Sequence, residues 1–154
     1  RANKEKIRDC DIVFIAVPTP TTPEKFDDSI VRASLALVGK GKTAVIKGDG
    51  KQSRDYVYVG DVVAANVAAL DGDFVGPVNI GTGIETDVVA IYNHLRDAVG
   101  SQLQAQHGPA KPGEQRRSCI DNRRAGEVLG WRPQVTLADG LQRTAAYYRA
   151  HLAK

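Results

Sequence analysis

The chain has 154 residues, 42% of them hydrophobic, and its 21 Lys and Arg against 18 Asp and Glu give a formal net charge of +3. These values are typical of a folded domain and exclude a disordered chain, a collagen and a coiled coil. A chain of this length can bury a core without disulfides or a structural metal, so we expect one domain over residues 1–154.

The cysteine and hydropathy patterns indicate a reduced compartment and no membrane. Cys10 and Cys119 are far apart and have no CxxC spacing or nearby histidine cluster, which predicts free thiols rather than a disulfide framework or a zinc site. The longest apolar run, residues 12–17, is far shorter than the roughly 20 residues of a membrane span. No signal-peptide pattern opens the chain. We therefore expect a cytoplasmic protein with no membrane partner.

The first third of the chain predicts a βαβ unit. Residues 11–17 form a continuous apolar, β-branched run that is typical of a strand covered on both faces, hence of a parallel sheet. Prolines in residues 18–23 end this strand because each lacks a backbone N–H and restricts its predecessor. Apolar positions at helical spacing over residues 30–38 then predict a helix, and residues 43–46 predict a second buried strand with a right-handed crossover.

The character of the sequence changes after residue 46. Gly48-Asp-Gly50 predicts a turn, and residues 54–59 predict a strand with Arg54, Tyr56 and Tyr58 on one face. A helix is predicted over residues 61–70, a short strand over 77–80 and a turn at 81–83.

Helices dominate the last part of the chain. Thr86 or Asp87 is expected to cap a helix with apolar residues at 88, 91, 92, 95 and 99 on one face, and residues 102–113 are expected to be a loop. A short strand at 118–120, a small helix at 124–129 and a final amphipathic helix complete the chain. The predicted fold class is α/β, with a Rossmann-like parallel sheet of three or more strands flanked by helices and a small C-terminal α+β portion.

Two glycine-rich segments suggest phosphate binding, with unequal support. Gly39-Lys-Gly-Lys-Thr43 lies between a helix and a strand, the reverse of a P-loop, so a helix-ending turn is favoured. Gly81-Thr-Gly-Ile-Glu-Thr86 has the strand-turn-helix context of a dinucleotide fingerprint, but Thr86 replaces its third glycine. Direct phosphate contact there remains the weaker of two interpretations.

Catalytic and metal-ligating patterns are absent from the sequence. The three histidines are scattered, no Tyr has a Lys four residues later, and no carboxylate pair has a clear proton-transfer arrangement. A basic stretch without interleaved aromatic residues argues against nucleic acid as a partner. It predicts either a solvated face or a site for a phosphorylated small molecule. Its members are Lys111, Arg116, Arg117, Arg123 and Arg124.

Residues 1–47 resemble an internal piece of the cofactor domain of nucleotide-sugar 6-dehydrogenases such as UDP-glucose dehydrogenase. The resemblance rests on Asp-Ile-Val-Phe-Ile-Ala-Val-Pro-Thr-Pro at 11–20, Asp-Asp-Ser-Ile at 27–30 and Gly-Lys-Thr-Ala-Val-Ile-Lys at 41–47. In that family the loop after the strand lies beside NAD. The resemblance therefore implies Pro18 and Thr19 as cofactor-binding residues and NAD as a possible cofactor.

Residues 48–154 resemble the C-terminal third of UDP-glucose 4-epimerases and related extended short-chain dehydrogenase/reductases. The motifs are Gly48-Asp-Gly-Lys-Gln-Ser-Arg-Asp-Tyr-Val-Tyr-Val-Gly-Asp61, Asn79-Ile-Gly-Thr-Gly83, Lys111-Pro-Gly-Glu114 and Leu129-Gly-Trp-Arg-Pro133. The resemblance implies that Arg54 and Lys111 hold the substrate diphosphate and that Asn79 occupies the position of the family's strand-end asparagine, which makes these three the predicted substrate-binding residues. From the residues alone, Arg54 could instead pair with Asp55 or Asp61.

These two resemblances meet near residues 47 and 48, which suggests a join between fragments of two Rossmann-type enzymes. The glycine fingerprint, the Tyr and Lys of the epimerases and the Cys-bearing domain of the dehydrogenases are not recognised. The leading hypothesis is thus a folded chimera without a complete catalytic site that keeps weak UDP-sugar or nucleotide diphosphate binding. The alternatives are an NAD-dependent nucleotide-sugar epimerase or dehydrogenase, and an assembly module. An uncovered sheet edge also predicts a homodimer.

Overall fold

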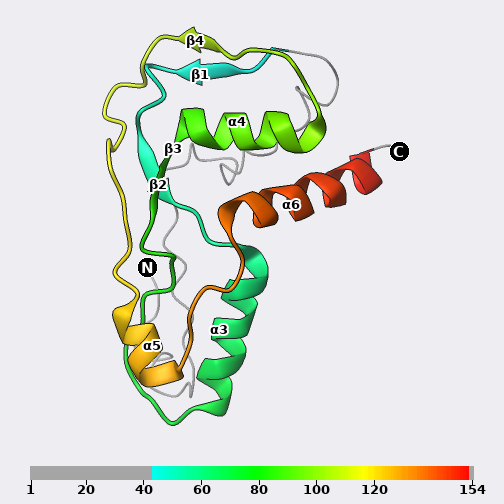
Figure 1. The fold of residues 1–154 in the computed structure, drawn as a ribbon. Coiled ribbons are helices and arrows are strands. Elements are labelled where there is room, and N and C mark those ends of the chain that lie inside the picture. Colours follow the sequence, from blue (N-terminus) through cyan, green and yellow to red (C-terminus); the bar gives the residue numbers. More distant parts are fainter. Residues whose placement is uncertain (1–42, 153–154) are drawn as a thin grey trace, which may run out of the picture.

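A computed structural model describes residues 43–152 (Figure 1). The elements in chain order are β1 (Val45–Lys47), β2 (Ser53–Asp55), α3 (Val59–Asp71), β3 (Glu85–Asp87), α4 (Val88–Val99), β4 (Gln106–Gly108), α5 (Arg123–Leu129) and α6 (Leu137–Leu152). The predicted strand at 11–17 and the cofactor-binding residues Pro18 and Thr19 lie outside the described residues. None of the helices between residues 43 and 152 is long and apolar enough to cross a bilayer.

A parallel strand pair covered by a helix confirms the α/β fold class. β1 and β4 pair in parallel, with Ile46 opposite His107. α4 covers one face of this pair (Figure 1), where Ala44 and Ile46 pack against Val88 and Tyr92. Strand β4 lies inside the segment 102–113, where the sequence predicted only a loop. Its residues, Gln106-His107-Gly108, lack the β-branched pattern that normally indicates a strand.

A second, antiparallel pair leads directly into α4. β2 pairs with β3, Ser53 lying opposite Asp87. Asp87 is also the N-cap of α4, and its side chain accepts a hydrogen bond of 2.7 Å from the backbone N–H of Ala90. The helix ends at Gly100, whose φ of 70° is left-handed. The predicted cap at Asp87 is therefore confirmed.

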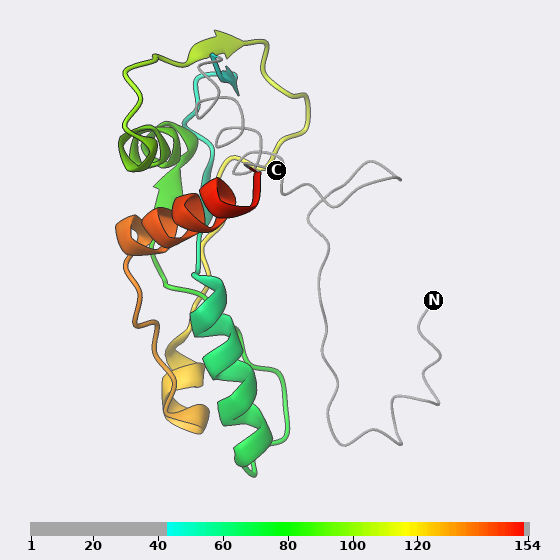
Figure 2. The same ribbon diagram turned by 90° about the vertical axis from the view of Figure 1, so that its right-hand side faces the viewer.

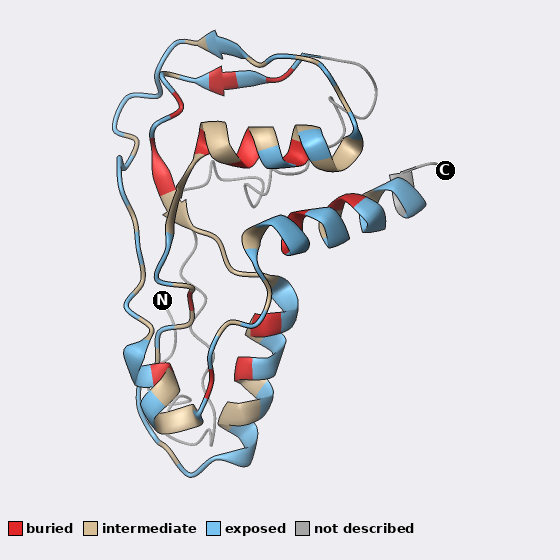
Figure 3. Cartoon of the chain, viewed as in Figure 1, coloured by how far each residue is buried: buried red, intermediate tan, exposed pale blue. Residues whose placement is uncertain are grey.

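Helices α4 and α6 enclose the apolar centre of the molecule. Ile91 and Leu95, four residues apart on one face of α4, are 0% and 1% exposed. They pack against Leu141 and Ala145 of α6, and Figure 3 shows the buried positions on these two helices. The i, i+4 spacing of the apolar residues places them on one face of each helix.

Helices α3 and α5 form the opposite end of the molecule from β1 and β4, as Figures 1 and 2 both show. The buried residues there are Ala65, Ala125 and Trp131. The Trp131 indole N–H donates a 2.8 Å hydrogen bond to the carbonyl oxygen of Asp61, in the first turn of α3.

Three strands predicted between residues 54 and 120 need correction. Residues 77–80 form no strand, although Val78 and Ile80 are partly buried against the α3–α5 cluster. Residues 118–120 also form no strand. The strand predicted over 54–59 ends at Asp55, because Tyr58 is the N-cap of α3. In residues 77–80, the alternate apolar positions reflect partial burial against the helices rather than membership of a strand.

Candidate functional site

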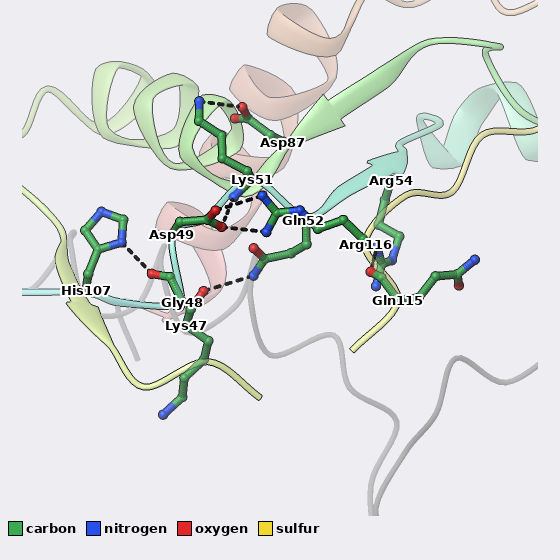
Figure 4. Close-up of polar contacts among 10 residues, drawn as sticks. All are labelled: Lys47, Gly48, Asp49, Lys51, Gln52, Arg54, Asp87, His107, Gln115 and Arg116. Atoms are coloured by element: carbon green, nitrogen blue, oxygen red, sulfur yellow. Dashed lines mark hydrogen bonds and ion pairs between the residues drawn. The ribbon is translucent and has the colours of Figure 1, made fainter. Parts of the chain in front are cut away.

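The Gly48-Asp-Gly50 turn connects β1 to β2 and begins the candidate site (Figure 4). Gly48 and Gly50 have φ angles of 63° and 70°, the left-handed region that favours glycine. A Cβ on Gly50 would lie 2.6 Å from Cγ2 of Val89 and 2.8 Å from Cγ2 of Ile46. Packing and backbone conformation therefore both require glycine at residue 50, and the turn projects Asp49 away from the core.

Asp49 forms a two-pronged ion pair with Arg116. Nη1 and Nη2 of Arg116 each donate a 2.7 Å hydrogen bond, to Oδ1 and Oδ2 of Asp49 respectively. Oδ1 also accepts a 3.0 Å hydrogen bond from the backbone N–H of Lys51. The hydrogen bonds from Arg116, followed by that from Lys51, hold the pKa of the Asp49 carboxyl well below its ordinary value. Both side chains are more than half exposed, at 57% for Asp49 and 59% for Arg116.

Two further contacts fix the segment that follows the turn. The Lys51 ammonium lies 3.1 Å from Oδ2 of Asp87, which joins the turn to the N-cap of α4. The buried side chain of Gln52 donates a 3.1 Å hydrogen bond to the carbonyl oxygen of Lys47. The backbone N–H of Ala90 is the main reason that the pKa of Asp87 is lowered, and Lys51 contributes less. Residues 47–52 are thereby fixed against both β1 and α4.

Arg54 lies on β2 and is directed at the basic segment. Its Nη1 donates hydrogen bonds of 2.7 Å to the Ser53 carbonyl oxygen and 2.8 Å to the Gln115 carbonyl oxygen. The Ser53 N–H donates to the carbonyl oxygen of Arg116 over 2.9 Å. The bonds from Arg54 to Gln115 and from Ser53 to Arg116 join β2 to a segment that lies 61 or more positions further along the sequence.

The alternative of an Arg54 ion pair with Asp55 or Asp61 does not hold within residues 43–152. Asp55 accepts hydrogen bonds from the Thr82 and Gly83 backbone N–H groups, each 2.8 Å long. Asp61 is buried and accepts from two backbone N–H groups of the segment before α6. Both carboxylates therefore fix backbone segments, and neither forms an ion pair with the Arg54 guanidinium.

A groove of about 370 Å³ lies beside the Asp49–Arg116 pair. Its lining residues are Lys47, Gly48, Asp49, Gln52, Ala110, Lys111, Glu114 and Arg116. Three cationic and two acidic side chains leave this surface with a positive balance. Lys111, predicted as a diphosphate ligand, lies in the groove. Arg54 does not line it, but Arg54 donates to the carbonyl oxygen of Gln115, which lies between the lining residues Glu114 and Arg116 in the sequence. A volume of this size falls in the range of small-molecule sites.

Asn79 is exposed and does not line this groove, so the structure does not bring it together with Arg54 and Lys111 in one site. Neither a site role for Asp49 nor its pairing with Arg116 was predicted from the sequence. Arg116 was visible as part of the basic stretch. Asp49 was assigned only to a turn, and the 67 residues that separate the two hid their pairing.

The Gly81-Thr-Gly83 turn is held by a carboxylate of the chain itself. Besides the two backbone N–H groups, the Thr82 hydroxyl donates to Oδ1 of Asp55 over 2.5 Å. The amide of Asn122 donates to the Gly81 carbonyl oxygen over 2.7 Å. The N–H donors that a phosphate would need are thus occupied by Asp55, which argues against the phosphate-binding interpretation of this turn.

A second groove, of about 570 Å³, lies next to this turn. Its lining residues are Thr82, Asn122, Arg123, Gly126, Glu127, Trp131, Arg132 and Pro133. It contains none of Arg54, Asn79 and Lys111, although Arg123 of the predicted basic stretch lines it. Among residues 43–152 there is no cluster of His, Cys, Asp and Glu side chains that could hold a metal ion. Cys119 is a free, exposed thiol.

The sequence matches the GDP-mannose 4,6 dehydratase family over residues 4–144. This match covers nearly the whole chain, including the basic groove and Arg54. The chain belongs to the GDP-mannose 4,6 dehydratase family. The matched range spans the position near residue 47 where the sequence suggested a join, so the family match gives no support for a chimera.

The individual proteins that are similar to this chain include UDP-glucose 4-epimerases. The UDP-glucose 4-epimerase of Mycolicibacterium smegmatis is 44% identical over 115 residues, which cover 71% of this chain and 35% of that protein. The crystal structure of the Thermotoga maritima UDP-glucose 4-epimerase with UDP-glucose is 36% identical, with a TM-score of 0.78, and the match covers 85% of this chain and 42% of that one.

A third relative contains a cofactor. The Thermus thermophilus UDP-glucose 4-epimerase in complex with NAD is 30% identical, with a TM-score of 0.73, and the match covers 84% of this chain and 43% of that one. The Rossmann-like fold class predicted from the sequence is confirmed by these structural matches. In length, the chain spans less than half of each of these relatives.

Proposed function

We propose that this chain provides the nucleotide-sugar-binding side of an NAD-dependent nucleotide-sugar epimerase or related enzyme, with a UDP-sugar as its ligand. The observation that carries the proposal is the basic groove that contains Lys111, together with the hydrogen bond of Arg54 to the segment between its lining residues Glu114 and Arg116. Family membership supports the enzymatic alternative over a chain that has lost its catalytic role, because the relatives include UDP-glucose 4-epimerases.

Arg54 is suited to hold a diphosphate. Both of its hydrogen bonds within residues 43–152 come from Nη1, which leaves Nε and Nη2 as donors for an anion. Two carbonyl acceptors fix the orientation of the guanidinium before a ligand arrives, and a planar fork matches phosphate oxygens in pairs. We expect Arg54 to contribute more to affinity than Lys111, whose exposed ammonium is a point charge on a flexible stem.

NAD enters this proposal through the relatives and the sequence resemblance. The Thermus thermophilus epimerase was solved in complex with NAD, and Pro18 and Thr19 are the cofactor-binding residues that the resemblance to nucleotide-sugar 6-dehydrogenases implies. NAD would supply a hydride acceptor, and the groove would hold the nucleotide diphosphate while the sugar reacts. Asn79 is retained as a candidate substrate-binding residue on the resemblance alone. A homodimer also remains a prediction.

Titration calorimetry with UDP-glucose tests the proposal. Arg54→Ala should weaken binding by about tenfold or more, because one strong charge-assisted contact is lost. Lys111→Ala should weaken it by about threefold, as expected for an exposed single charge. Arg117→Gln is the matched control: Arg117 carries the same charge, lies next to Arg116 and pairs with Glu85 outside the groove.

A second measurement separates binding from turnover. With NAD added, chromatography tests whether UDP-glucose is converted to its 4-epimer, and conversion that is lost in Arg54→Ala would show that this chain itself turns the ligand over. Binding without conversion would favour the alternative of a nucleotide-sugar-binding protein with no complete catalytic site. Unchanged affinity in Arg54→Ala would contradict the proposed site.

A further inference from the structure

Arg116 has the properties of a ligand-binding residue, although the basic stretch left its role open between a solvated face and a phosphate site and the resemblance assigned it none. Its side chain lines the basic groove together with Lys47 and Lys111. Its backbone is fixed, because the Arg116 carbonyl oxygen accepts a hydrogen bond from the Ser53 N–H. Its guanidinium is 59% exposed and its two terminal nitrogens contact one carboxylate, that of Asp49.

We infer that Arg116 is a third anion-binding residue of the groove, and that Asp49 occupies its guanidinium in the empty site and is displaced by the ligand's diphosphate. This inference rests on the proposed function and deepens it. A carboxylate and a phosphate present the same pair of acceptor oxygens to the two-pronged donor face of an arginine. Asp49 therefore takes the place that a phosphate oxygen pair would take.

The exchange requires little free energy from the ligand. An exposed ion pair contributes little to stability because water competes for both partners, so breaking this one is inexpensive. The released Asp49 carboxylate keeps its hydrogen bond from the Lys51 N–H. The Gly48 and Gly50 positions hold the turn independently of Arg116, through their left-handed conformation and the close contacts of Gly50. The groove can thus exchange one anion for another without rearranging its backbone.

A different role for the same pair makes the opposite prediction. If the Asp49–Arg116 pair only held residues 114–117 against the turn, loss of either side chain would make the groove less ordered and lower its affinity for the ligand. In the exchange that we propose, loss of Arg116 lowers the affinity for the ligand, whereas loss of the Asp49 charge frees Arg116 and raises that affinity. The sign of the Asp49 effect therefore decides between the two roles.

The experiment is a titration of the full chain with inorganic pyrophosphate and, separately, with UDP-glucose. Arg116→Gln should weaken both probes by about tenfold. Asp49→Asn should raise the affinity for both by about threefold, because an exposed ion pair of this kind competes only modestly with the ligand. In the double variant Asp49→Asn/Arg116→Gln the gain from Asp49→Asn should vanish, since it acts through Arg116.

Matched controls separate this effect from net charge. Asp121→Asn removes an equally exposed carboxylate that is paired with Arg123 outside the groove, and Arg117→Gln removes a neighbouring cation. Neither should change affinity by more than about 1.5-fold, because solvent and salt screen exposed charges at a distance. A thermal unfolding midpoint for each variant confirms that it is folded.

The outcomes distinguish this inference from the proposed function. If UDP-glucose binds the wild-type chain but Asp49→Asn weakens it, the exchange is wrong and the nucleotide-sugar site stands. If pyrophosphate shows the expected pattern and UDP-glucose does not bind, the anion exchange stands and the nucleotide-sugar proposal is wrong. If neither probe binds the wild-type chain, both are overturned.

Discussion

The groove end of the molecule and the α3–α5 end each contain an aspartate from the same motif, but the two carboxylates have different partners. Asp61 is 4% exposed, and its Oδ2 accepts hydrogen bonds from the backbone N–H groups of Gln134 and Val135, at 3.2 and 3.0 Å. Asp49 is exposed and accepts mainly from the Arg116 side chain.

The difference shows which part of the motif holds the fold and which part can respond to a ligand. Backbone donors cannot move away without moving the chain, so Asp61 fixes the path from Trp131 to α6. A guanidinium on a flexible stem can leave its partner while the backbone stays in place. Asp55, midway between the two in sequence, is half-buried and belongs to the first kind, because it accepts backbone N–H groups from two segments.

The largest effect is expected at Asp61. Asp61→Ala leaves two backbone N–H groups without their acceptor in a buried setting, and it should lower the free energy of unfolding by about 3 kcal/mol. Asp61→Asn keeps one acceptor oxygen and should cost about half as much. Denaturant unfolding followed by circular dichroism measures both. Asp71→Asn, an exposed change at the other end of α3, is the control and should stay within about 0.5 kcal/mol.

A smaller loss is expected at Asp55. Asp55→Ala should cost about 2 kcal/mol, because water can reach part of this site and replace some of the lost hydrogen bonds. The local consequence is more specific than the global one. Amide hydrogen exchange should accelerate at Thr82, Gly83 and Ile120, the three residues whose N–H groups Asp55 accepts. Unchanged exchange at these amides would show that Asp55 does not hold the turn.

Much of the helical fold was predictable because its signals are local. The Asp87 cap, the apolar spacing of α4, the approximate limits of α3 and α5 and the presence of a final amphipathic helix were all visible in the sequence. The short strands were not. β4 has no apolar side chain and pairs because β1 lies beside it, whereas residues 77–80 partly bury two apolar side chains and form no strand within the described range 43–152. Pairing depends on distant segments, which periodicity within one segment does not report.

The candidate site divides in the same way. Lys111 and Arg54 could be named from motifs, but the hydrogen bond of Arg54 to the Gln115 carbonyl oxygen and the pairing of Asp49 with Arg116 are long-range contacts. Asn79 shows the converse. Its motif predicted a shared site, yet the segment that carries it is not a strand, and Asn79 lies outside both grooves.

An intermediate effect is expected at Asp87, which links the two kinds of partner by accepting from the Ala90 N–H and from Lys51. Asp87→Ala should cost about 1 kcal/mol, the usual value of an N-cap, and Asp87→Asn should cost less because Asn also caps helices. The folded-state pKa of Asp87 lies below its ordinary value of 3.8, so its charge stabilises the fold above that pH. This contribution should be lost as the pH falls below 3.8 towards the folded-state pKa, and the Asp87→Asn variant should lack this component of acid destabilisation.

The smallest effect on stability is expected at Asp49, which sharpens the comparison with Asp61. Both residues are aspartates in one motif, and the Asp49 pair has the shorter hydrogen bonds, yet solvent surrounds it. Asp49→Asn should therefore leave the thermal unfolding midpoint within error of the wild type, because an exposed ion pair gains little over hydrated partners. Arg116→Gln should behave in the same way. A clear loss of stability in either variant would show that the pair holds the fold, and the division between fixed and exchangeable carboxylates would then fail at the groove.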